Sequence, residues 1–128
     1  MVLGGCIHVD FSLYKSYIRM SFVDIFSASL AEIFGDFSFK DFARGGGPLA
    51  FGKGMVGYAG VIFFLIKSLR VGNVAYVNGM WDGISGLIET LAAIFIFGEK
   101  LNGWIQYVGL AMIIGGTFCL HSGGIPYN

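Results

Sequence analysis

The sequence has few charged side chains: Asp, Glu, Lys and Arg together make up 12% of its 128 residues. An average soluble domain carries about 25% charged residues, so this shortage argues against a soluble protein. Eight basic and eight acidic residues cancel to a net charge of zero, which removes the basic surface that a nucleic-acid partner would need. Hydrophobic residues reach 55% and indicate a membrane protein.

Cysteine and histidine are also scarce, with two of each. Cys6 and Cys119 stand far apart and show no Cys-x-x-Cys or Cys/His spacing, so the sequence predicts neither a metal site nor a disulfide framework. His8 and His121 are isolated near the two ends of the chain. The sequence also has no phosphate-binding glycine loop and no nucleophile–base motif. We therefore expect no metal, no cofactor and no enzyme activity.

Four apolar stretches dominate the chain, at residues 20–39, 49–66, 73–97 and 104–120. Each is close to the roughly 20 residues that a helix needs to cross the hydrocarbon core of a bilayer. None alternates with the period of two that membrane-spanning strands show. We predict an all-α, polytopic membrane protein with four transmembrane helices in a bundle.

The ends of the chain differ from this apolar middle. We expect residues 1–19 to form a short N-terminal extension, either an arm or an interfacial segment. Residues 20–120 form the predicted four-helix transmembrane domain, and residues 121–128 form a C-terminal tail. A cleaved signal peptide is not expected, because Asp10 interrupts the early apolar stretch and Lys15 is the first basic residue.

Small residues recur four positions apart on three of the predicted spans. The pairs are Ala50 with Gly54, Gly79 with Gly83, and Ala111 with Gly115. Membrane helices associate through close backbone packing, which such faces permit. One pair could arise by chance in a glycine-rich chain, but three pairs predict tight helix–helix packing.

The basic residues do not favour one orientation in the membrane. One side of the predicted bundle carries Lys15, Arg19, Lys67 and Arg70, and the other carries Lys40, Arg44, Lys53 and Lys100. This balance of four against four allows insertion in both orientations, and hence antiparallel pairing of two copies, although it also arises by chance.

Carboxylates inside the predicted spans are the main candidates for function. Glu32 lies near the middle of the first span, Asp36 lies one turn beyond it, and Asp82 and Glu89 lie on the third span. An ionised carboxylate at the bilayer centre costs about 2.5–3.5 kcal/mol or more, and such residues usually mark a proton or cation path. A group that gains and loses a proton at that depth can exchange it for a cation. The alternative is that these acids form structural ion pairs with Lys or Arg of another span.

Several short motifs carry a resemblance to a known family. They are the run AEIFGDFSFK at residues 31–40, Tyr58 in the second span, Trp81-Asp82-Gly83 in the third, and FGEKL at residues 97–101. In their order and spacing they resemble the small multidrug resistance family, within the drug/metabolite transporter superfamily. The resemblance covers residues 20–120.

This resemblance implies a four-helix subunit, dual topology and an antiparallel homodimer in a plasma or inner membrane. It also implies export of hydrophobic or guanidinium-type cations in exchange for protons. Glu32 would be the shared site for proton and substrate, and Tyr58 and Trp81 would line the cavity. Asp36, Asp82 and Glu89 are acids beyond those that the family's dimer needs, and Asp36 is a candidate for the same site because it lies one turn from Glu32. Gly83 would help the third span to bend.

A second interpretation is structural. The chain could keep a transporter-like bundle as a membrane subunit of a larger assembly, such as a virus particle with an internal membrane or an organellar complex. Its N-terminal arm and C-terminal tail would then dock to other membrane or capsid subunits, and no transport would occur.

Overall fold

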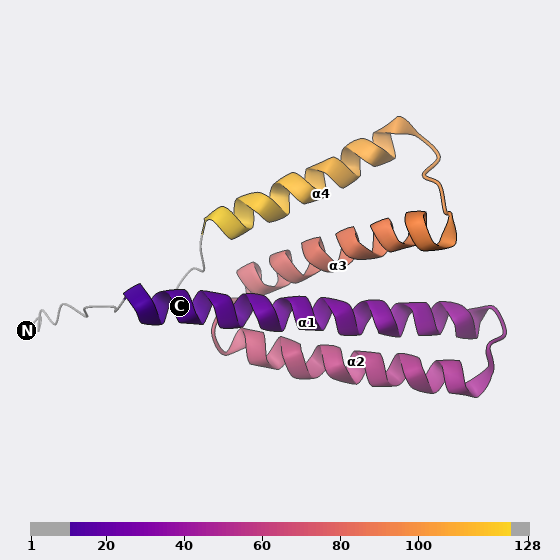
Figure 1. Cartoon of the computed structure of the whole chain (residues 1–128), viewed down its shortest axis with the longest axis horizontal. Coiled ribbons are helices and arrows are strands. Elements are labelled where there is room, and N and C mark those ends of the chain that lie inside the picture. The colour runs from indigo at the N-terminus through magenta and orange to yellow at the C-terminus, as the bar shows by residue number, and fades with distance from the viewer. Residues whose placement is uncertain (1–10, 124–128) are drawn as a thin grey trace, which may run out of the picture.

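All regular structure in the computed structural model, which describes residues 11–123, is α-helical. The helices are α1 (Phe11–Ala43), α2 (Gly47–Leu69), α3 (Val74–Phe97) and α4 (Trp104–Ser122) (Figure 1). The predicted all-α, four-helix architecture is therefore confirmed.

Turn and capping residues set the ends of the helices. Gly45 has a φ of 97°, a left-handed conformation that the turn between α1 and α2 requires, and Pro48 follows in the first turn of α2. The side chain of Asn73 caps α3 by accepting a hydrogen bond of 2.9 Å from the backbone N–H of Tyr76. At the other end of α3, Gly98 has a φ of 66° and stops the helix.

Three helices, α2, α3 and α4, are long and apolar enough to cross a membrane. The first predicted span, residues 20–39, lies within α1, which carries three acids in that part and starts earlier than expected, at Phe11. Residues 11–19 of the predicted extension therefore continue α1 as a helix. The predicted docking segments fall partly on residues 1–10 and 124–128, which lie outside the described residues.

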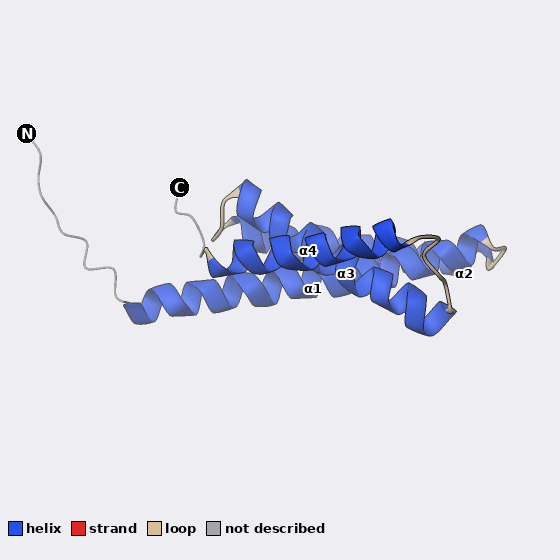
Figure 2. Cartoon of the chain, turned by 90° about the horizontal axis from the view of Figure 1, so that it is seen from above, coloured by secondary structure: helices blue, strands red, loops and turns tan. Residues whose placement is uncertain are grey.

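The helix α1 lies at the centre of the arrangement, between α2 and α3, and α4 lies on the outer side of α3 (Figures 1 and 2). A small core joins α1 to α3 and contains Ile25, Tyr76, Val77 and Met80, each at most 4% exposed. The two halves of the chain are thus held together mainly through α1.

Glycines allow α1 and α2 to approach closely. A Cβ atom on Gly57 would lie 2.7 Å from both the Cα and the N of Gly35, so the two backbones touch here. Ala50 and Gly54 are buried on the same face of α2, and a Cβ on Gly54 would meet the ring of Phe39 at 2.5 Å. This first predicted pair of small residues therefore lies in a packed helix–helix contact.

The other two small-residue pairs differ from each other. Gly79 and Gly83 both face α4, where Gly83 packs directly against Thr117. Ala111 and Gly115 are exposed, and a Cβ on Gly115 would meet nothing within 4 Å. The second pair packs as expected, whereas the third makes no packing contact within the described subunit.

Candidate functional site

Five of the residues predicted for the site lie together where α1, α2 and α3 meet. Glu32 and Asp36 come from α1, Tyr58 from α2, and Trp81 and Glu89 from α3, and each is half-buried. Their side chains lie close enough to interact across the three helices. We call this group the carboxyl cluster.

A hydrogen bond joins two helices inside the cluster. The Tyr58 hydroxyl donates to Asp36 Oδ1 over 2.6 Å, which ties the middle of α2 to α1. The ring of Tyr58 also packs against Phe39, with ring centroids 5.6 Å apart. Tyr58 is therefore oriented both by its hydroxyl and by its ring, and it holds Asp36 in one position.

Glu32 lies in a polar but incompletely satisfied environment. Ser85 and Trp81 on α3 lie beside its carboxyl group. Even so, Glu32 Oε2 and Trp81 Nε1 are both buried without a hydrogen-bond partner. A buried carboxylate oxygen and a buried N–H that lack partners are costly, and a ligand or a proton would relieve that cost.

Ser85, which is 5% exposed, was not among the residues predicted for the site. Trp81, Ser85 and Glu89 succeed one another at intervals of four residues and so form one stripe along α3. This spacing, once Trp81 and Glu89 are candidates, is the signal that identifies Ser85.

Glu89 brings a third carboxyl group to the cluster. Its side chain interacts with Asp36 and lies near Glu32. Its Oε1 atom is buried and has no hydrogen-bond partner. Three carboxyl groups thus share one location between the helices, and their mutual repulsion favours the binding of positive charge there.

Ion pairs with lysine lie elsewhere in the described part of the chain. Lys67 donates to Asp24 over 2.8 Å, and the Asp24 side chain is only 5% exposed. Lys40 pairs with Glu99 beyond the other end of the cluster. The structural pairing considered for the acids therefore applies to Asp24, and none of the ion pairs among residues 11–123 involves Glu32.

Two of the predicted residues lie apart from the cluster. Asp82 is exposed, although it is near enough to Glu32 for their charges to interact. Gly83 faces α4 and packs against Thr117 rather than facing the carboxyl groups. Asp82 and Gly83 therefore contribute no group to the cluster in this subunit.

The chemistry of the cluster suits an organic cation. Carboxylates supply the counter-charge, and the rings of Tyr58 and Trp81 supply faces that attract cations. Among residues 11–123, no group of three or more His, Cys, Asp or Glu residues has an arrangement that could hold a metal ion.

Comparison with known proteins finds two similar bacterial proteins. The chain is 31% identical over 96 residues to the multidrug resistance protein EbrB of Bacillus licheniformis, covering 75% of this chain and 80% of that protein. It is 36% identical over 70 residues to the quaternary ammonium compound-resistance protein QacE of Escherichia coli, covering 52% of this chain and 60% of that protein. No family model matches the chain. No solved structure matches it either.

The likeness to EbrB spans most of both chains, at 75% of this chain and 80% of that protein. The spans α2, α3 and α4, together with these relatives, make the protein an integral, multi-pass membrane protein. The chain belongs to the small multidrug resistance family.

Proposed function

We propose that the protein exports small hydrophobic or guanidinium-type cations across a membrane in exchange for protons, with Glu32 as the carboxyl group that binds either. The observation that carries this proposal is the buried Glu32 Oε2 atom, which has no hydrogen-bond partner and lies beside Trp81. The names of the relatives, which refer to multidrug resistance and to resistance against quaternary ammonium compounds, support a cationic substrate.

Because Glu32 is partly buried, its carboxyl group binds either a proton or a cation, but not both at once. An ionised carboxylate at this depth is costly unless it is neutralised. Either a proton on the carboxyl oxygen or a cation beside it removes that cost. The two ligands therefore compete, and this competition is what couples the outward movement of a cation to the inward movement of protons.

The neighbouring residues divide the remaining tasks. Trp81 and Tyr58 provide the aromatic walls, and the hydroxyl of Tyr58 fixes Asp36. Asp36 and Glu89 add negative charge beside Glu32, which strengthens cation binding and provides further positions for protons. We assign Asp36 to the binding site together with Glu32, and Glu89 as an additional acid.

Export further requires that the site open to each side of the membrane in turn. We propose that the functional unit is an antiparallel homodimer that arises from dual topology. The balance of basic residues supports this arrangement, and so does α4, which has no buried residue. A second copy against α4 would cover apolar side chains such as Trp104, Met112 and Phe118, each more than 70% exposed.

We assign the bend of α3 during opening to Gly83. This position packs directly against Thr117 of α4 and leaves no room for a side chain. We keep Asp82 as an additional acid, because its charge interacts with that of Glu32 although its own side chain is exposed. The structural-subunit interpretation is less well supported, because both relatives carry names of resistance proteins.

The test is cation flux in liposomes that contain the purified full chain. A proton gradient directed out of the vesicles, with an acidic lumen, should drive uptake of tetrapropylammonium or guanidinium in exchange for protons, and Glu32→Gln should abolish this uptake. Asp41→Asn is the matched control. Asp41 lies on the same helix and is exposed, and it follows Asp36 by more than one helical turn, outside the carboxyl cluster. This control should transport at the wild-type rate.

Two outcomes would reject the proposal. One is flux by Glu32→Gln at the wild-type rate. The other is the absence of flux of either cation by the wild-type protein under a proton gradient, while the protein remains folded in the vesicles. The second outcome would favour the structural-subunit interpretation.

A further inference from the structure

A second polar site lies away from the carboxyl cluster, at the end of the bundle where α1 begins and α4 ends (Figure 1). It is a pocket of about 660 Å³. Its lining residues are Ser12, Lys15, Ser16, Arg19, Phe22 and His121. We call it the basic pocket.

The serine and basic side chains of the basic pocket come from one stripe of α1. Ser12, Lys15, Ser16 and Arg19 follow the spacing i, i+3, i+4 and i+7, which places them on one face of the helix. This face therefore combines two cations with two hydroxyl groups. Ammonium, guanidinium and hydroxyl groups are the donors that commonly bind phosphate oxygens.

The inner end of the pocket is closed by an aromatic contact between α1 and α4. The rings of Phe22 and His121 lie with centroids 5.4 Å apart, tilted by 58°. This contact keeps the last turn of α4 beside α1, although the rest of α4 packs on α3. The pocket thus has an apolar floor and a basic wall.

No carboxylate is among the lining residues that the structure describes, so the charge of Lys15 and Arg19 is not balanced within that lining. The nearest acid in the described part of α1 is Asp24, which is buried against Lys67. Lys15 and Arg19 are both exposed. Two cations one turn apart, with no acid among the described lining residues, form a site for an anion.

The depth of the pocket indicates which anion it meets. At a rise of about 1.5 Å per residue, Arg19 and Lys15 lie roughly 5 and 10 Å beyond the level of Phe22. The span α4 ends at Ser122, next to that level. The headgroup layer extends about 5–8 Å beyond the hydrocarbon core on each side. Arg19 therefore lies at the depth of the lipid phosphates, and Lys15 lies just beyond that layer, within reach of it through its long flexible side chain.

We propose that the basic pocket binds the phosphate of an anionic lipid headgroup. Arg19 and Lys15 pair with the phosphate oxygens, and Ser16 lies on the same face with its hydroxyl available to the headgroup. Phe22, which is 38% exposed, provides apolar surface for the acyl chains at the inner end of the pocket. A free phosphate ion would use the same donors but would gain nothing from this apolar surface.

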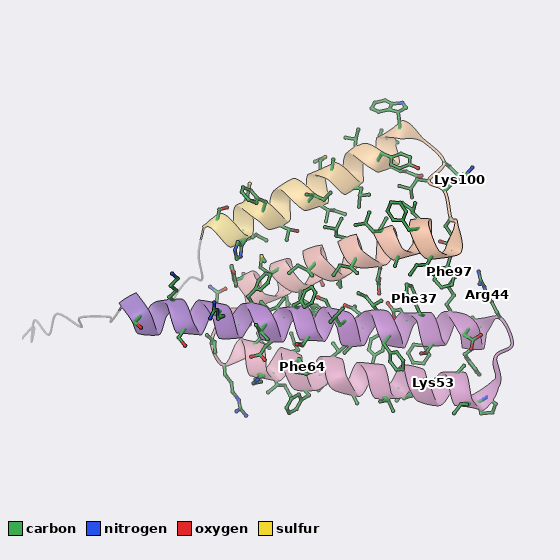
Figure 3. The ribbon with its side chains drawn as sticks, in the orientation of Figure 1. Phe37, Arg44, Lys53, Phe64, Phe97 and Lys100 are labelled. Carbon is green, nitrogen blue, oxygen red and sulfur yellow. The ribbon has the colours of Figure 1, made fainter. Side chains whose placement is uncertain are left out.

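The experiment is lipid binding to the purified full chain in nonionic detergent, followed by native mass spectrometry. Phosphatidylglycerol, phosphatidylcholine and inorganic phosphate are titrated separately. We expect one tight phosphatidylglycerol site per subunit, and a loss of about thirtyfold in affinity in the double variant Lys15→Gln/Arg19→Gln, at roughly 1 kcal/mol per basic residue. Arg44→Gln/Lys53→Gln, whose basic residues lie at the opposite end of the bundle (Figure 3), should change affinity less than twofold.

Three results would overturn the proposal: equal loss of affinity in both double variants, equal binding of phosphatidylcholine and phosphatidylglycerol, or displacement of the lipid by millimolar inorganic phosphate. The last would assign the pocket to a free anion. If the double variant fails to fold, Arg19→Gln alone should weaken binding about fivefold. The proposal does not depend on cation transport, so the liposome assay and this assay can fail independently.

Discussion

The close contact between α1 and α2 leads to a sharp prediction, because it involves backbone on both sides. In Gly57→Ala, the new Cβ would lie 2.7 Å from the Cα and N of Gly35 and 2.8 Å from the carbonyl oxygen of Ala31. Ordinary van der Waals contact begins near 3.4 Å, so the helices must separate by about 0.7 Å. No flexible side chain is available to move aside.

The magnitude follows from two opposing effects. Overpacking of a well-packed contact costs about 1–3 kcal/mol. Replacement of glycine by alanine in a helix returns up to about 1 kcal/mol through backbone entropy. We therefore expect Gly57→Ala to lower the free energy of unfolding by up to roughly 2 kcal/mol.

Gly52→Ala is the matched control on the same helix. A Cβ on Gly52 would meet nothing within 4 Å, so only the favourable entropy effect remains. We expect this variant to be unchanged or more stable by up to about 1 kcal/mol. Unfolding by SDS in mixed micelles, followed by tryptophan fluorescence, measures both variants.

Transport should respond as well, because Ala31 and Gly35 flank Glu32 on α1. Separation of the helices at this level displaces the Glu32 carboxyl group relative to Tyr58. We expect Gly57→Ala to reduce cation flux and Gly52→Ala to leave it unchanged. Equal stability of the two variants would refute the close contact, and with it the position of Glu32 that depends on it.

Three further predictions concern single side chains. Lys67→Met leaves the carboxylate of Asp24 buried without its partner and should destabilise the protein by about 1–3 kcal/mol, as measured by SDS unfolding. This loss is smaller than the loss expected from breaking a fully buried ion pair, because the side chain of Lys67 is half-exposed. Tyr58→Phe removes the donor to Asp36 and should weaken cation binding several-fold while the protein remains folded, as measured by equilibrium dialysis; wild-type affinity would show that this hydrogen bond does not position the site. Asn73→Ala removes the cap of α3 and should cost about 1 kcal/mol in the same unfolding assay, and no change would contradict the capping role.

The number and approximate position of the helices could be predicted from the sequence, because length and apolarity decide them in a bilayer. The extension of α1 back to Phe11 could not, since residues 11–19 include Lys15 and Arg19 and lack a continuous apolar run. Outside the hydrocarbon core, apolarity no longer identifies a helix. The basic pocket, which depends on this extension and on the end of α4, was therefore not predicted either.

The sequence predicted most of the residues of the candidate site, but it did not predict the contacts between them. The interval of four residues places Glu32 and Asp36 on one face of α1, as expected from the sequence. The hydrogen bond between Tyr58 and Asp36 depends on the register between α1 and α2, which is set by backbone contact at Gly57. Periodicity within one helix carries no information about such a register.

The ion pair between Asp24 and Lys67 shows the same limit. The sequence offered structural pairing as one possibility for every acid in the spans, but it did not show which acid would pair. The structure assigns that role to Asp24, because Lys67 at the end of α2 lies opposite the beginning of the first span. Glu32 is deeper in the bundle, where α2 presents Tyr58 rather than a base.

The central claim, that a cation and a proton compete for Glu32, is tested most directly by proton release. Tetrapropylammonium is added to the purified protein in weakly buffered detergent solution near neutral pH, and a pH indicator records protons that enter the solution. We predict that the wild-type protein releases protons in proportion to the cation bound, and that Glu32→Gln loses the release that depends on this carboxyl group. Cation binding without proton release by the wild-type protein, or equal release by Glu32→Gln, would contradict the account.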